Sequence, residues 1–298
     1  MKAAFLDVGG LRTRYLIAGD GPLLMLIHPV GYPAEIFARN IDELARDYTV
    51  VAPDLPGQGH SAAPAGWTGA PQALMADQVL ALASHLGFDR LAVMGSSLGG
   101  LVAARTALQA PQRVTALVLT GTGSVFNDPV GQPEVLKAVY ANGSRAYAEP
   151  SLQALRARIA NTCFRPPDAD DILVAHMTAY ALPGAAEAYR DIMDRLARSM
   201  DEGEALAFPY LEDIVARTLV IIGRDDTRTS LAAHRDGAAR MRDAGLLCLN
   251  ECGHLPFLEH PQRFNEAVSR FLAGAAAGER ARSMGGALSP ATTVKRLG

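Results

Sequence analysis

The sequence predicts an α/β protein with a doubly wound, mostly parallel sheet and an inserted helical cap. Three observations support this fold class. First, short apolar runs recur along the chain and are bounded by Gly, Pro, Asp or His. Second, segments with helical patterning lie between most of these runs. Third, one interval, nearly a third of the chain, has no such run. Strands that are apolar on both faces are typical of a parallel sheet covered by helices on both sides.

The apolar runs are the predicted strands, and they lie at residues 23–27, 49–52, 91–94, 114–119, 219–222 and 246–249. Helices are predicted between or after them at 71–86, 98–109, 231–244 and 261–273. Because strands and helices alternate, we expect parallel strands joined by right-handed crossovers.

The interval without a strand signal is predicted to form the cap, since prolines divide it into several amphipathic helical segments. The expected organisation is a sheet core at residues 1–124 and 215–274, with the cap at 125–214 between its two parts. Residues 275–298 are small, polar and rich in glycine. This composition favours a flexible C-terminal tail.

The composition is that of a soluble globular protein, with 298 residues, 49 % apolar and 20 % charged. The net charge is −3 and the basic residues are dispersed, which favours a small-molecule substrate over nucleic acid or a membrane surface. A homo-oligomer is left open. The N-terminal apolar patch is too short for a secretion signal and no segment approaches a membrane span, so we expect a cytoplasmic protein. The spacing of Cys163, Cys248 and Cys252 indicates neither disulfides nor a zinc site, and no metal or cofactor is expected.

The stretch VMGSSLGG, residues 93–100, carries the first candidate for chemistry. Only Ser97 is centred in a Gly-x-Ser-x-Gly pattern, between Gly95 and Gly99. Such a serine occupies a sharp turn from a strand into a helix, where side chains at the two glycine positions would collide with neighbouring segments. The predicted strand and helix flank this stretch directly, so Ser97 is the predicted nucleophile.

A serine hydroxyl reacts only when a base accepts its proton. His254 is the predicted base, because it follows the last predicted strand and should share the carboxyl edge of the sheet with Ser97. His60, in a glycine-rich turn after the strand at 49–52, could line the mouth of the site. Three further histidines are expected at solvated or helix-entrance positions: His85, His234 and His260.

The base in turn needs a carboxylate that fixes its tautomer. The turn GRDD after the strand at 219–222 offers Asp225 and Asp226, and either could reach His254. The chain order of serine, aspartate and histidine is that of nucleophile-elbow hydrolases. Asp54 also follows a strand, and we expect it to order its loop.

Five motifs stand in the order found in the α/β-hydrolase superfamily, which the chain resembles over residues 10–273: HPVG, DLPGQGHS, GSSLGG, GRDD and CGHLPFLEHP. The resemblance implies that Asp226 is the acid. It also implies an oxyanion hole formed by the backbone N–H groups of Val30 and Leu98, with His28 bracing the first loop.

The cap sequence resembles that of the meta-cleavage-product hydrolases, which break a carbon–carbon bond in dienoates. This chain departs from that subfamily at several positions. Ser96 precedes the nucleophile in place of Asn, Leu255 replaces a large aromatic residue after the catalytic histidine, and HPVGYP replaces the first glycine-rich loop. His176 aligns with the cap arginine that grips the substrate carboxylate, for which Arg165 or Arg190 could substitute. The candidate substrate contacts are therefore His28, Ser96, His176 and Leu255.

The leading hypothesis is a serine hydrolase that cleaves a small apolar or aromatic carboxylic ester. Hydrolysis of a carbon–carbon bond of the meta-cleavage type is the second hypothesis, and a receptor-like protein that binds a ligand with little turnover is the third. Aromatic residues of the cap could shape an apolar pocket: Phe126, Tyr140, Phe164, Tyr180 and Tyr189.

Overall fold

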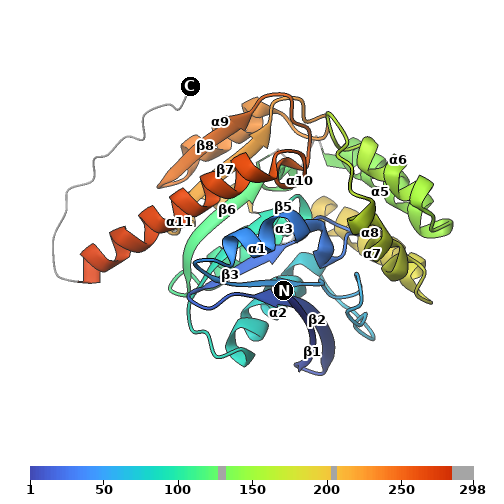
Figure 1. The fold of residues 1–298 in the computed structure, drawn as a ribbon, viewed down its shortest axis with the longest axis horizontal. Coiled ribbons are helices and arrows are strands. Elements are labelled where there is room, and N and C mark those ends of the chain that lie inside the picture. Colours follow the sequence, from blue (N-terminus) through green and yellow to red (C-terminus); the bar gives the residue numbers. More distant parts are fainter. Residues whose placement is uncertain (127–131, 203–206, 284–298) are drawn as a thin grey trace.

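An eight-stranded sheet forms the centre of the molecule (Figure 1). The computed structural model describes residues 1–126, 132–202 and 207–283. The strands stand in the spatial order β1-β2-β4-β3-β5-β6-β7-β8. Their bounds are β1 Lys2–Val8, β2 Leu11–Ala18, β3 Leu23–Ile27, β4 Thr49–Pro53, β5 Leu91–Ser96, β6 Val114–Thr120, β7 Arg217–Gly223 and β8 Ala244–Leu249.

The six predicted strands are present and form the parallel part of the sheet. Each neighbouring pair from β4 through β3, β5, β6 and β7 to β8 is parallel. Every side chain of β3, β4 and β5 is buried. Burial on both faces explains why these strands are continuous apolar runs, and the predicted fold class is confirmed.

The N-terminal hairpin was not predicted. β1 and β2 pair with each other in antiparallel fashion, and β2 continues the sheet through an antiparallel pairing with β4. Most side chains of β1 are exposed or half-buried, and Phe5 is 47 % exposed. An edge strand of this kind lacks the continuous apolar run that identified the inner strands.

Helices cover both faces of the sheet (Figure 1). On one face α1 (Ala38–Leu44) packs against α11 (Pro261–Ser283), and on the other α2 (Pro71–His85) packs against α3 (Leu98–Gln109). α9 (Leu231–Arg240) ends before the predicted residue 244, where β8 already begins. α11 continues beyond the predicted end at residue 273, because Ala, Glu and Arg in this segment favour a helix. The rest of the predicted tail, 284–298, lies outside the described residues.

The chain between β6 and β7 is helical, as the sequence predicts for this interval. After the short α4 (Gly123–Phe126) it forms α5 (Gln132–Ala148), α6 (Leu152–Ala160), α7 (Asp170–Tyr180), α8 (Ala185–Asp201) and the 3-10 helix η3 (Phe208–Asp213). We call α5 to α8 the helical insertion. In it α5 packs against α8, and α6 against α7, to one side of the sheet helices (Figure 1). Among the described residues, no helix is long and apolar enough to cross a membrane.

Candidate active site

Ser97 forms the one-residue turn between β5 and α3. Its backbone has φ 53° and ψ −118°, in the positive-φ region that non-glycine residues rarely occupy. A Cβ atom on Gly95 would lie 2.0 Å from the carbonyl oxygen of Gly99, and a Cβ atom on Gly99 would lie 2.1 Å from that of Ile27. Both glycines are therefore required by the close approach of strand and helix that places Ser97 at the turn.

His254 and Asp226 form a hydrogen-bonded pair. His254 Nδ1 lies 2.8 Å from Asp226 Oδ2, and His254 is only 6 % exposed. Burial opposes ionisation of Asp226, but the adjacent His254 and the N–H of Arg228 outweigh it and lower the pKa of this carboxyl. An ionised Asp226 accepts a hydrogen bond from the Nδ1–H group of His254, so that Nε2 of the same ring carries no proton and can accept one. Asp225 instead accepts the N–H of Cys252 at 3.3 Å.

One cavity of about 50 Å³ brings the predicted residues together. Ser97, His254, Val30 and Leu98 all line it. Within the described ranges, the backbone N–H groups of Val30 and Leu98 have no hydrogen-bond acceptor, and Ser97 Oγ makes no hydrogen bond to His254. Hydrogen bonds of this type often form only when substrate is bound.

The rest of the cavity wall is mostly apolar. It is formed largely by α3 and by the helices α5 and α8, with the aliphatic residues Leu101, Val135, Leu136, Val139, Met193, Leu196 and Met200. A larger cavity of about 450 Å³ lies between α5 and α8 and shares Leu136, Met193 and Met200 with it. Apolar cavities with a few convergent polar groups are typical of small-molecule sites.

His28 links the two loops that follow β3 and β4. Its Nε2 accepts the N–H of Leu55 at 2.9 Å, and its Nδ1 donates to the carbonyl of Pro29 at 2.8 Å. Burial lowers the pKa of His28, which is therefore neutral. These contacts fit the expected bracing role, and His28 is not among the residues that line the cavity with Ser97.

Arg158 of α6 holds the same loop from the other side, and the sequence did not point to it. Its guanidinium donates to the carbonyl of Val30 at 2.9 Å, to that of Gly31 at 3.1 Å, and to the hydroxyl of Tyr180 at 2.6 Å. It lies over the ring of Tyr32 at 4.2 Å and is 4 % exposed. Arg158 thus ties the helical insertion to the loop that carries the Val30 N–H.

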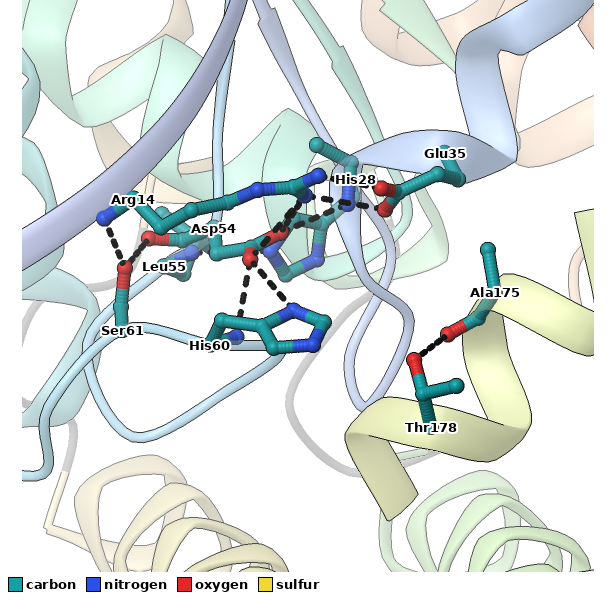
Figure 2. Close-up of polar contacts among 10 residues, drawn as sticks. Arg14, His28, Glu35, Asp54, Leu55, His60, Ser61, Ala175 and Thr178 are labelled. Atoms are coloured by element: carbon teal, nitrogen blue, oxygen red, sulfur yellow. Dashed lines mark hydrogen bonds and ion pairs between the residues drawn. The ribbon is translucent and has the colours of Figure 1, made fainter. Parts of the chain in front are cut away.

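Asp54 also holds the loop after β3, through its carboxylate (Figure 2). The side chain is fully buried and accepts the N–H groups of Ala34 at 2.7 Å and His60 at 2.8 Å. Arg14 lies between Asp54 and Glu35 and pairs with both (Figure 2). The expected loop-ordering role of Asp54 fits these contacts, and His60 belongs to this cluster rather than to the wall of the cavity.

The remaining predicted substrate contacts are not among the residues that line the cavity. Ser96 and Leu255 are buried, and His176 packs against the rings of Tyr32 and Tyr180. Neither ring nitrogen of His176 has a hydrogen-bond partner in the described part of the chain. Burial lowers the pKa of His176 to about 3, which keeps it neutral. The two alternative arginines are exposed in ion pairs with glutamates: Arg165 with Glu251, and Arg190 with Glu187.

The five aromatic residues expected to shape the pocket are not among those that line the cavity with Ser97, whose wall is mainly aliphatic. Phe126 packs against His234, and Tyr180 and Tyr189 surround the Arg158 side chain. Tyr140 lines the larger cavity and Phe164 is 43 % exposed.

The prediction that His234 is solvated was wrong. His234 is fully buried and accepts the N–H of Thr122, because α9 turns this side toward α4. In the part of the chain that the structure describes, no group of three or more His, Cys, Asp or Glu side chains could hold a metal ion.

Comparison with known proteins agrees with this architecture. The chain is 32 % identical over 280 residues to the dihydrolipoyllysine-residue acetyltransferase component of the acetoin cleaving system of Cupriavidus necator, covering 91 % of this chain and 69 % of that protein. It is 30 % identical over 270 residues to 2-hydroxymuconate semialdehyde hydrolase of Pseudomonas sp. strain CF600, covering 89 % and 92 %. The solved structure of a meta-cleavage product hydrolase from Pseudomonas fluorescens IP01 is similar, with a TM-score of 0.78, 25 % identity and coverage of 91 % and 98 %. Residues 22–261 match the alpha/beta hydrolase fold family, so the chain belongs to the α/β-hydrolases and is an enzyme of that family.

Proposed function

We propose that this α/β-hydrolase is a serine hydrolase that cleaves a small carboxylic ester with Ser97, His254 and Asp226. The observation that carries the proposal is the hydrogen-bonded pair of His254 and Asp226 lining the same cavity as Ser97. The strained turn at Ser97 supports the same assignment, and so do the N–H groups of Val30 and Leu98, for which the described residues provide no acceptor.

In the proposed reaction, Ser97 Oγ attacks the ester carbonyl carbon while its proton passes to His254 Nε2. The oxyanion accepts hydrogen bonds from the N–H groups of Val30 and Leu98, and each such donor typically lowers the barrier by about 2.7–4 kcal/mol. The imidazolium of His254 then protonates the leaving alkoxide. Water hydrolyses the acyl-serine with His254 as base, which restores Ser97. The N-terminus of α3 adds a positive dipole end beside the oxyanion.

Hydrolysis of a carbon–carbon bond is the second candidate function. It is favoured by the similarity to 2-hydroxymuconate semialdehyde hydrolase, which extends over 92 % of that protein. The cap arginine that grips the carboxylate in the meta-cleavage-product hydrolases is replaced here by His176, which is neutral and is not among the residues that line the cavity. Esterase activity therefore remains our first proposal, with the insertion α5 to α8 acting as a cap over the cavity.

The test compares the turnover of p-nitrophenyl acetate and butyrate with the bleaching of a coloured dienoate. We expect ester turnover to exceed dienoate turnover, and Ser97→Ala to lower kcat by about 10⁴-fold or more. Faster dienoate bleaching would establish the second candidate instead.

Covalent labelling with a fluorophosphonate separates an enzyme from a receptor-like binding protein. We expect Ser97 to be labelled in the wild-type protein and in the matched variant Ser84→Ala, whose serine is exposed on α2. Ser97→Ala should remain unlabelled. A wild-type protein that binds a ligand tightly without labelling would contradict the proposed function.

A further inference from the structure

Arg228 places a positive charge in the wall of the cavity that contains Ser97. It lies in the loop after β7, two positions beyond Asp226, and lines the cavity together with Ser97 and His254. Its Nε is buried and has no hydrogen-bond partner among the residues that the structure describes. Within the described ranges, no carboxylate lies within ion-pair distance of its guanidinium.

The surroundings of Arg228 make such a charge costly. The cavity wall around it is mainly aliphatic, and burial lowers the pKa of Arg228. An arginine side chain nevertheless stays protonated in proteins, so the charge persists. A buried charge without a partner is destabilising, whereas the same charge paired with an anion forms a strong bidentate contact.

Asp226, two positions before Arg228, does not supply that anion. Asp226 Oδ2 is hydrogen-bonded to His254 Nδ1, and Asp226 Oδ1 accepts the backbone N–H of Arg228, not its guanidinium. Arg158 adds a second positive charge that acts on Arg228 through space. The guanidinium of Arg158 is already bonded to backbone carbonyls and a hydroxyl, so Arg228 is the charged donor that the cavity wall offers to a ligand.

We propose that Arg228 binds a carboxylate of the substrate, so that the ester cleaved by this enzyme is an anionic one. Because Arg228 and Ser97 line one cavity of about 50 Å³, the carboxylate and the scissile carbonyl are separated by a short chain. Monoesters of short dicarboxylic acids and acyl esters of small hydroxy acids meet this description. The inference rests on the proposed serine hydrolase activity and names its substrate class.

Two pairs of esters test the proposal, one for each side of the scissile bond. The first pair is p-nitrophenyl hemisuccinate and p-nitrophenyl butyrate, and the second is 4-acetoxybenzoate and 4-methylphenyl acetate. In each pair the ratio of kcat/KM for the anionic ester to that for the neutral ester is measured in the wild-type protein and in Arg228→Gln. Intrinsic differences between the esters cancel in this comparison.

We expect Arg228→Gln to lower this ratio at least fivefold in one pair, mainly through KM, and Arg228→Lys to retain part of it. The matched control Arg190→Gln changes an exposed arginine of α8 and should leave both ratios intact. A change below fivefold in both pairs would overturn the proposal, including a uniform loss of activity on both esters, which is what a purely structural role produces.

A binding measurement separates this inference from the proposed function. Succinate should raise the melting temperature of Ser97→Ala and have no effect on the double variant Ser97→Ala/Arg228→Gln. If succinate binding depends on Arg228 but the wild-type protein hydrolyses no ester, the proposed function is contradicted and the anion site is supported. If the protein hydrolyses esters but the ratios of kcat/KM for anionic and neutral esters do not depend on Arg228, the anion site is contradicted and the proposed function is supported.

Discussion

Substitution of Arg158 by methionine tests whether the helical insertion holds the loop of the oxyanion hole in place. Methionine keeps an unbranched apolar side chain but removes every donor. The carbonyl of Val30 then loses its contact with Arg158, whereas the carbonyl of Gly31 still accepts the hydroxyls of Tyr180 at 2.5 Å and Tyr147 at 3.2 Å. The perturbation is therefore concentrated on Val30, whose N–H is the proposed oxyanion donor.

The expected loss of stability follows from these contacts. An unsatisfied buried carbonyl costs about 1–3 kcal/mol. The lost cation–π contact with Tyr32 adds roughly 0.5–2 kcal/mol. Relief from burying the Arg158 charge offsets part of this sum, so we expect a net decrease in the free energy of unfolding of about 1–4 kcal/mol.

The expected loss of activity has an upper limit. Removing one oxyanion donor typically lowers kcat by about 10²–10³-fold, and Arg158→Met displaces the Val30 N–H without deleting it. We therefore expect a decrease in kcat for p-nitrophenyl acetate of at least tenfold, up to about 10³-fold, with a smaller change in KM. Lysine can donate to one of the carbonyls, so the kcat of Arg158→Lys should lie between those of the wild type and of Arg158→Met.

Urea denaturation and steady-state kinetics on the three proteins give both quantities. The kinetic measurement is made at a temperature and urea concentration at which each protein is fully folded. A variant that loses stability but keeps kcat within twofold of the wild type would refute the positioning argument and reduce Arg158 to a structural contact.

Three further predictions concern the triad, the turn and a buried histidine. Asp226→Asn should lower kcat by about 10⁴-fold, because His254 loses the carboxylate that fixes its tautomer; retained activity would contradict the triad. Gly95→Ala should prevent soluble folded expression, since its Cβ would meet a carbonyl oxygen at 2.0 Å, whereas the control Gly245→Ala has room and should fold normally. His176→Phe should flatten the acid limb of the stability profile measured by urea titration from pH 8 to pH 4, and an unchanged profile would refute the argument.

The sign of that last effect follows from proton linkage. Burial lowers the pKa of His176 from 6.5 to about 3, so the unfolded chain binds this proton more readily than the folded one. The neutral state stabilises the fold fully above pH 6.5, and the contribution is lost as the pH falls from 6.5 toward 3. Phe cannot titrate, and its ring also removes the two unpartnered nitrogens of His176.

The sequence alone predicted the six inner strands, the alternation of strands and helices along them, and Ser97, His254 and the GRDD turn as the candidate site. These are local properties. A strand buried on both faces must be a continuous apolar run, and a nucleophile at a sharp turn must be flanked by glycines, so each leaves a pattern within a few neighbouring residues. The choice between Asp225 and Asp226 needed either a family resemblance or coordinates, because both lie in the same turn.

Only the tertiary structure decided what surrounds these residues. Arg158 and Arg228 resemble any other arginine in the sequence. Nothing nearby along the chain indicates that Arg158 is buried against carbonyls of a distant loop, or that Arg228 lines the cavity that contains Ser97. His234 was misplaced for the same reason. Whether a charge is solvated, paired or free depends on which segments meet in space, and such contacts join residues more than a hundred positions apart.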